Sequence, residues 1–142
     1  MRSDESTAVS RFRAARVARL ATADAAGLPH LVPVTFAVSP TDSPLLVVFA
    51  IDHKPKTTTD LRRLRNIAAN PRVSLLADHY DEDWTRLWWS RLDGIAEILT
   101  DPAARALPLS WLAAKYSQYQ AVPPAGPLVQ IAVDSIRGWS YA

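Results

Sequence analysis

The residues best suited to chemistry lie between two short apolar runs, at 45–51 and 73–77. Between these runs the sequence collects cations with hydroxyl and amide side chains, notably Lys54, Lys56, Thr57, Arg63 and Asn66. Cations and hydroxyls at the point where a buried strand leads into a helix are typical of sites that hold phosphate or carboxylate. We therefore predict an anion-binding site between the two runs.

The composition indicates one globular domain over residues 1–142. Of the 142 residues 49% are hydrophobic, which is enough for one core and leaves no room for a second domain. The absence of cysteine excludes disulfides, thiolate metal ligands and cysteine nucleophiles. No apolar run approaches the roughly 20 residues of a membrane-spanning helix, and the N-terminus is polar. We expect a soluble, cytoplasmic protein without membrane contact.

Hydrophobic periodicity predicts the elements of the first half. A helix is expected at 4–15, followed by a hairpin of strands at 17–23 and 29–38 whose turn contains Gly27. Pro29 and Pro33 cannot donate to a ladder, so the second strand should be irregular or lie at an edge. A Ser/Pro-rich turn leads into a third strand at 45–51, and a helix follows at 59–69, capped by one of the threonines at 57–59 and stopped by Asn70.

The second half continues with strands and one helical region. We expect a strand at 72–77, an acidic turn at 78–83 and a long strand at 84–99 with a bulge near Gly94. A helical pair at 102–120, interrupted at Pro108, then precedes a last strand from Leu128 into Trp139. Antiparallel neighbours with few helices between them favour a mainly β fold, a six-stranded barrel, because closure removes exposed edges. A doubly wound parallel sheet is disfavoured, since helices do not alternate with every strand.

Five segments also carry a family pattern, at 17–22, 27–34, 66–75, 92–96 and 137–139. In this order they resemble the split-barrel flavin-binding superfamily of pyridoxamine 5'-phosphate oxidase, and within it the actinobacterial branch that uses the deazaflavin coenzyme F-420. The resemblance implies a six-stranded antiparallel split β-barrel of the FMN-binding type. It also implies a homodimer with F-420 at its interface, acting as an oxidoreductase that passes hydride to a small conjugated or aromatic acceptor.

The family places a basic residue of the phosphate site three positions before the helix asparagine. Here that residue is Arg63, before Asn66. The family usually has lysine there, and this chain has additional residues, including Lys54, Lys56 and Thr57, ahead of it. Whether Arg63 or the Lys54/Lys56 pair receives the phosphate stays open. The pattern of true pyridoxamine phosphate oxidases is not otherwise recognisable, so vitamin B6 oxidation is not expected.

Other residues are candidates for contact with the cofactor ring. His30 is suited to a hydrogen bond with a ring carbonyl, or to a satisfied position in its strand. Residues Pro33, Val34 and Thr35 are suited to backbone contacts along the ring, or to ordinary strand packing. Because Trp88 and Trp89 point to opposite faces of one strand, one of them must meet something outside the core, and Trp88 is our candidate for the flat ring.

Several alternatives remain beside F-420. An FMN-dependent oxidoreductase of the same fold, or a non-catalytic flavin, deazaflavin or haem carrier, would fit the same residues. Catalytic residues are not assigned, because a reduced deazaflavin supplies hydride from its own ring. The sequence has no dinucleotide glycine fingerprint, and the spacing of its histidines and acids matches no metal motif. Nucleic-acid binding is not expected, because no aromatic platform accompanies the arginines.

Overall fold

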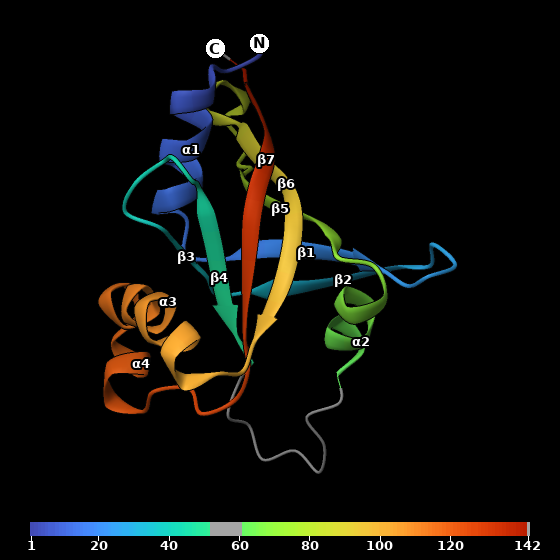
Figure 1. The fold of residues 1–142 in the computed structure, drawn as a ribbon. Coiled ribbons are helices and arrows are strands. Elements are labelled where there is room, and N and C mark those ends of the chain that lie inside the picture. Colours follow the sequence, from blue (N-terminus) through green and yellow to red (C-terminus); the bar gives the residue numbers. More distant parts are fainter. Residues whose placement is uncertain (52–60, 142) are drawn as a thin grey trace.

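One curled antiparallel sheet forms the body of the molecule (Figure 1). The computed structural model describes residues 1–51 and 61–141. Within them the sheet has the strand order β2-β1-β5-β6-β7-β4-β3, and it curls into a half-barrel with short helices around it. The strands are β1 (Ala18–Ala23), β2 (Pro29–Val34), β3 (Ala37–Val38), β4 (Leu46–Ala50), β5 (Arg72–His79), β6 (Trp88–Leu99) and β7 (Leu128–Ser140).

The helices lie around the two ends of this sheet. They are α1 (Glu5–Ala14), α2 (Arg62–Ala69), α3 (Pro102–Lys115) and α4 (Ser117–Ala121), with a single 3-10 turn, η1 (Trp84–Arg86). In Figure 1, α1 lies beside the upper end of β7, while α3 and α4 lie across the lower end of β4 from α2. In the described part of the chain, no helix has the length and apolar character needed to cross a membrane.

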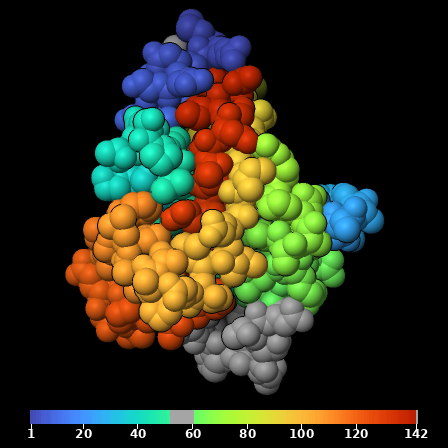
Figure 2. Space-filling model, viewed as in Figure 1, coloured from blue at the N-terminus to red at the C-terminus, as the bar shows by residue number. Residues whose placement is uncertain are grey.

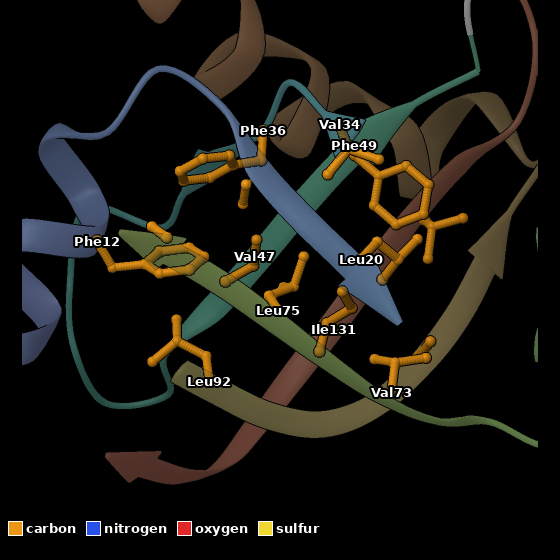
Figure 3. Close-up of a cluster of buried hydrophobic side chains, with 14 of the residues drawn as sticks. Phe12, Leu20, Val34, Phe36, Val47, Phe49, Val73, Leu75, Leu92 and Ile131 are labelled. Carbon is orange, nitrogen blue, oxygen red and sulfur yellow. The ribbon is translucent and has the colours of Figure 1, made fainter. Parts of the chain in front are cut away.

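The main core fills the inside of the curl (Figure 3). Its largest fully buried side chains include Phe12 from α1, Leu20, Phe49 and Leu75 from three strands, and Phe36 from the connection between β2 and β3. Strand β4 is buried on both faces: Val47 and Phe49 point into this core, whereas Val48 and Ala50 pack in a second cluster with Leu112 of α3. This two-sided burial explains the unbroken apolar run at 45–51.

The hairpin predicted near Gly27 is confirmed. Strands β1 and β2 pair along their length, from Ala18 opposite Val34 to Ala23 opposite Pro29. The turn is held by Asp24, whose carboxylate accepts hydrogen bonds from the backbone N–H groups of Ala26 and Leu28, each 2.9 Å long. Gly27 has φ +86°, a conformation that favours glycine. Strand β2 forms one edge of the sheet, as its prolines predicted.

The single strand predicted at 29–38 is wrong, because it is two strands on opposite edges of the sheet. Strand β2 ends at Val34 and pairs with β1, whereas Ala37 begins β3, which pairs with β4. The described sheet therefore has seven strands, not six. Between the two strands the buried Phe36 directs its backbone N–H to the Tyr116 hydroxyl, 3.2 Å away, instead of to a neighbouring strand.

Two helix predictions also need correction. Helix α2 begins at Arg62, later than predicted, and its cap residue Leu61 makes no side-chain hydrogen bond; the threonines at 57–59, predicted to cap it, lie outside the described residues. The predicted stop at Asn70 is confirmed. The break in the helical pair falls at Tyr116 and not at Pro108, which is buried inside α3. Tyr116 is extended because its hydroxyl is fixed to the sheet end, whereas Pro108 costs α3 a single backbone donor.

The long hairpin of β5 and β6 differs from its prediction at the tip and agrees at the bulge. Strand β5 runs on to His79, so the acidic turn is shorter than 78–83, and Trp84 belongs to η1 rather than to β6. The register between β6 and β7 shifts between Asp93 and Gly94, which confirms the predicted bulge; the extra residue is Asp134 of β7. A side chain on Gly94 would overlap the carbonyl oxygen of Ala132.

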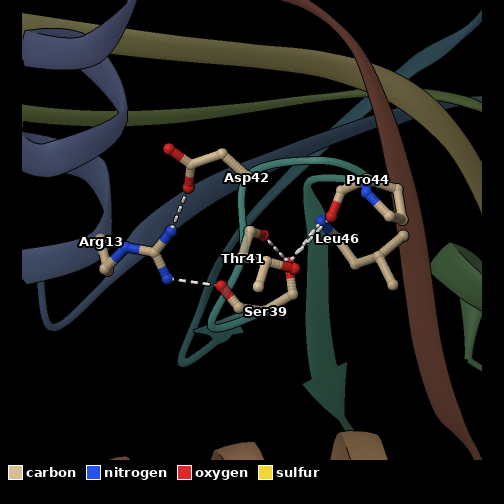
Figure 4. A network of polar contacts seen from close by, with 6 residues as sticks. All are labelled: Arg13, Ser39, Thr41, Asp42, Pro44 and Leu46. Atoms are coloured by element: carbon tan, nitrogen blue, oxygen red, sulfur yellow. Dashed lines mark hydrogen bonds and ion pairs between the residues drawn. The ribbon is translucent and has the colours of Figure 1, made fainter.

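A polar network fixes the turn into β4 (Figure 4). Arg13 of α1 donates to the Ser39 carbonyl and forms an ion pair of 2.7 Å with Asp42. The buried Ser39 hydroxyl donates to the Thr41 carbonyl and accepts from the backbone N–H of Leu46, both at 2.9 Å. These bonds tie the end of α1 to the start of β4, and they confirm the predicted turn at 39–44.

Replacing Gly94 with valine should lower the free energy of unfolding by about 2–4 kcal/mol, because the new side chain collides with backbone. Urea denaturation measures the change. Gly126→Ala is the matched control, since nothing lies within 4 Å of its Cβ position and its φ is not positive. The control should stay within about 0.5 kcal/mol of the original chain. Equal stability of both variants would contradict the close approach at Gly94.

Candidate functional site

A cleft of about 440 Å³ opens where β1 begins and β2 and β4 end. Its apolar walls are Val17, Pro33, Val34 and Ala50, and its polar groups come from Thr35, Arg63, Gln118 and the tyrosines 116 and 119. The volume lies within the roughly 300–1,000 Å³ of small-molecule sites, and the mixture of apolar walls with few polar groups is typical of them. Figure 2 shows the surrounding helices in the lower half of the molecule, with α3 and α4 in orange on the left and α2 in green on the right.

The Tyr116 hydroxyl holds the rim of the cleft together. It accepts a hydrogen bond from the backbone N–H of Phe36 at 3.2 Å and donates to the carbonyl of Arg16 at 2.7 Å. Those two residues adjoin Thr35 and Val17 in the cleft wall. Burial raises the pKa of Tyr116, and only the neutral hydroxyl can donate and accept at once. Tyr116 therefore fixes two wall segments that are far apart in sequence.

Tyr119 adds a second hydroxyl from α4. Its oxygen lies 3.1 Å from the Thr35 hydroxyl, and its ring meets that of Tyr116 edge to face, with centroids 5.8 Å apart. The wall segment at Thr35 and Phe36 is thus held to α3 and α4 by two tyrosine hydroxyls. The described lining of the cleft thus has hydroxyl groups from Thr35, Tyr116 and Tyr119 and a cationic group, Arg63, supplied by α2.

Lys115 is a half-buried cation directly behind this rim. Its ammonium group donates to the carbonyl of Ala15 at 2.6 Å and lies 3.7 Å from the centre of the Phe36 ring. Burial, together with the charges of Arg16 and Arg13, lowers the pKa of Lys115 from its ordinary value of 10.5 to about 8. The carbonyl and the ring face compensate part of this cost. Lys115 thus fastens the end of α3 to the connection between α1 and β1.

Arg63 is placed by a short helix whose inner face is anchored to β1. One turn after Arg63, the side-chain amide of Asn66 donates to the Thr22 hydroxyl at 3.0 Å, and both side chains are buried. Ile67 is buried beside them, whereas Arg62 and Arg65 are exposed. Of the three arginines of this helix, Arg63 is the one that lines the cleft in the described structure.

The structure brings together four of the ten predicted site residues, Pro33, Val34, Thr35 and Arg63, around this cleft. Asn66 lies beneath α2 against Thr22, and His30 lies four positions before Val34 on β2 with its Nδ1 buried. Trp88 lies on β6 under α1, where Arg11 is 5.8 Å from its ring centre. The predicted residues Lys54, Lys56 and Thr57 lie outside the described residues.

Sequence reasoning missed Tyr116, Gln118 and Tyr119. A signal was present, because the two tyrosines are spaced i, i+3 at the end of an otherwise apolar helical stretch, where they occupy one side. Val17 and Ala50 were missed for a different reason. Each is an ordinary apolar residue next to a strand end, and only the curl of the sheet turns it towards the cleft.

Comparison with known proteins supports this reading of the fold. The family model described as pyridoxamine 5'-phosphate oxidase matches residues 5–140. The chain belongs to this family. A comparison with curated protein sequences found no match. Family membership agrees with the resemblance read from the five segments, at the level of the family.

Several solved structures have the same fold. A FAD-binding protein from Mesorhizobium loti is 22% identical with a TM-score of 0.73, covering 97% of this chain and 93% of its own. The FAD-binding protein of Mycobacterium smegmatis is 18% identical with a TM-score of 0.64, covering 98% and 97%. HutZ, the heme storage protein of Vibrio cholerae, is 16% identical with a TM-score of 0.67, covering 97% and 95%. At these identities the likeness establishes the fold alone.

The lowered pKa of Lys115 predicts a defined pH dependence of stability. Below pH 8 the amine is protonated in the folded and the unfolded chain. Between pH 8 and about 10.5 only the unfolded chain keeps the proton, so stability rises with pH across this window. Urea denaturation of the original chain and of Lys115→Met should therefore diverge there, with the rise absent in the variant. A constant difference between the two chains from pH 7 to 10.5 would contradict the assignment.

Proposed function

We propose that this chain binds a flavin-type cofactor in the cleft at Arg63 and acts, as a homodimer, as an oxidoreductase on a small conjugated or aromatic acceptor. FMN, FAD and the deazaflavin F-420 all combine a flat ring with a phosphate-bearing tail. The observation that carries the proposal is the pairing of apolar strand ends with one arginine in a cleft of a member of this family. F-420 is the cofactor implied by the sequence resemblance, and FMN or FAD is the alternative.

The residues of the cleft suit such a group. Val17, Val34 and Ala50 offer apolar surface to a ring face, and Pro33 leaves its carbonyl but no N–H at the strand edge. Arg63 supplies a fixed guanidinium for a phosphate, which it can bind through two parallel hydrogen bonds. Because Arg63 lines the cleft, we propose it as the residue that receives the phosphate.

The cofactor, when bound, would supply the hydride chemistry itself. The chain's own residues bind the tail, hold the ring against the strand ends and exclude water from one of its faces. The hydroxyl pair of Tyr119 and Thr35 lies in the same cleft and is suited to orient a polar group of the cofactor or acceptor. An enzyme of this kind needs few acids or bases of its own.

A haem carrier is the second candidate, favoured by the likeness to HutZ. Haem iron usually takes an axial ligand such as histidine. The described part of the chain contains His30 and His79, and neither lines the cleft. His79 lies 3.0 Å from Asp81 at the far tip of the β5–β6 hairpin. These positions favour the flavin-type cofactor over haem.

The homodimer is proposed from an exposed apolar face of the sheet. A groove of about 480 Å³ crosses β2, β1, β5 and β6, and its lining includes Leu31, Trp89, Arg19, Arg91 and Asp78. Leu31 is 67% exposed, which is unusual for leucine on a strand. This face carries both Arg19 and Arg91 and the acidic Asp78. A second copy related by a two-fold axis would present the same face to it, so that arginine can meet aspartate and apolar side chains can pack together.

Arg63→Gln should weaken the binding of FMN or F-420 by about 10–100-fold, since a hydrogen bond to a charged group contributes about 1.5–3 kcal/mol. Fluorescence titration measures the dissociation constants. Arg62→Gln removes the same charge from an exposed position next to it and is the matched control. Riboflavin, which lacks the phosphate, should bind both variants alike.

Failure of the original chain to bind FMN, FAD and F-420 would overturn the proposed function. A Soret band on titration with haem, lost in a histidine variant, would favour the carrier instead. Turnover is tested with the reduced cofactor and a quinone or nitroaromatic acceptor. If the chain binds a flavin-type cofactor but shows no turnover, it is a cofactor-binding protein and the proposed enzyme activity is wrong. Comparison of FMN with F-420 in the same titration decides which cofactor the cleft prefers.

Leu31→Asp should convert the dimer to a monomer at micromolar concentration, because it buries a carboxylate in the proposed interface. Sedimentation velocity measures the change. Leu107→Asp is the control, because Leu107 is 63% exposed on α3 and does not line the groove. A monomeric original chain, or a Leu31→Asp variant that stays dimeric, would contradict this interface.

A further inference from the structure

We propose that the buried hydrogen bond between Asn66 and Thr22 is a positioning device, which fixes the rotation of α2 and thereby presents Arg63 to the cleft. The inference rests on the proposed function, since it concerns the residue that receives the cofactor phosphate. In it Asn66 acts through Arg63 and does not itself touch the ligand.

Helix α2 is a short helix whose packing on the sheet is mainly apolar. It spans only Arg62–Ala69, and its cap residue Leu61 makes no side-chain hydrogen bond. Ile67 is buried, and Leu61 and Leu64 pack partly against the main core. Apolar contacts of this kind are non-directional, so they hold the helix on the sheet without fixing its rotation about its own axis. A short helix needs a directional contact for that.

The bond from Asn66 to Thr22 supplies such a contact. The amide nitrogen and the hydroxyl oxygen are 3.0 Å apart, and the two residues are 4% and 3% exposed. A buried amide that loses its hydrogen-bond partner is destabilised by the desolvation of an unsatisfied polar group. The rotation of α2 that keeps the bond from Asn66 to Thr22 is therefore strongly preferred. Thr22 is a rigid reference, because β1 is paired on both sides, with β2 and with β5.

The rotation set at Asn66 determines where Arg63 points. Residues three apart on a helix lie on nearly the same side, one turn from each other. When Asn66 faces Thr22, Arg63 is directed along β1 and β2 towards the strand ends, where it lines the cleft with Pro33 and Val34. The neighbouring Arg62 is turned to solvent by the same rotation.

The test separates a loss of positioning from a loss of stability. The affinity ratio of FMN to riboflavin measures the phosphate contact, because the two ligands differ only in the phosphate group. Thr22→Val removes the hydroxyl and keeps the shape of the side chain, and it should lower this ratio about fivefold or more while the affinity for riboflavin changes less than twofold. Thr22→Ser keeps the hydroxyl and should keep the ratio. Thr100→Val, at an exposed position, is the control.

Hydrogen exchange gives a reading that does not depend on ligand. The amides of α2 should exchange faster in Thr22→Val and in Asn66→Ala than in Thr22→Ser. An unchanged ratio in a folded Thr22→Val, with Arg63→Gln still losing the phosphate preference, would overturn the inference and leave the proposed function intact. Equal loss of FMN and riboflavin affinity would also overturn it, since that outcome indicates a structural role alone. If the original chain bound none of FMN, FAD and F-420, the proposed function itself would fail.

Discussion

The structure depends on one short crossing of the chain, from β2 at one edge of the sheet to β3 at the other. Thr35 and Phe36 are the whole connection between Val34 and Ala37. Three steps between successive Cα atoms span at most about 11 Å, so the two edges must approach each other to that distance. A flat sheet of seven strands would keep its edges far apart. The crossing therefore forces the sheet to curl, and the half-barrel follows from it.

The crossing also explains why the candidate site lies where it does. The backbone at Phe36 leaves both ladders, so its N–H needs another acceptor, which the Tyr116 hydroxyl provides. The same tyrosine and its neighbours Lys115 and Tyr119 bring α3 and α4 against the gap between the edges. Apolar strand ends, two hydroxyl groups and Arg63 then meet around one opening. The features that complete the fold at this gap are those that shape the cleft.

Much of this could be predicted from the sequence, because local patterns decide it. The turn at Gly27 and the helix stop at Asn70 depend on residues close in sequence, and the glycine itself marks the bulge at Gly94; all three are present. The division of 29–38 into two strands could not be predicted, since its cause is a hydroxyl from Tyr116, eighty residues away. The extension of α3 through Pro108 depends likewise on packing rather than on local preference.

The residues of the candidate site also fall into two groups, those that could be predicted from the sequence and those that could not. Arg63 and the strand end at Pro33 to Thr35 could be found from the order of elements and the family pattern. Val17 and Ala50 could not, because they are ordinary apolar residues that only the curl brings to the cleft from distant segments. Asn66 was predicted as a cofactor contact. In the structure it lies one helical turn after Arg63, and its side-chain amide donates to the Thr22 hydroxyl.

The central claim is that the ligand binds at the gap between the two sheet edges. Backbone amide chemical shifts of the labelled protein, followed by NMR during titration with FMN and with F-420, test it most directly. The account predicts the largest changes at Val34, Thr35 and Arg63, with smaller ones at Tyr116 and Tyr119. Changes concentrated instead in the separate groove at Arg72, Ser74 and Asp134, with none at the gap, would contradict it.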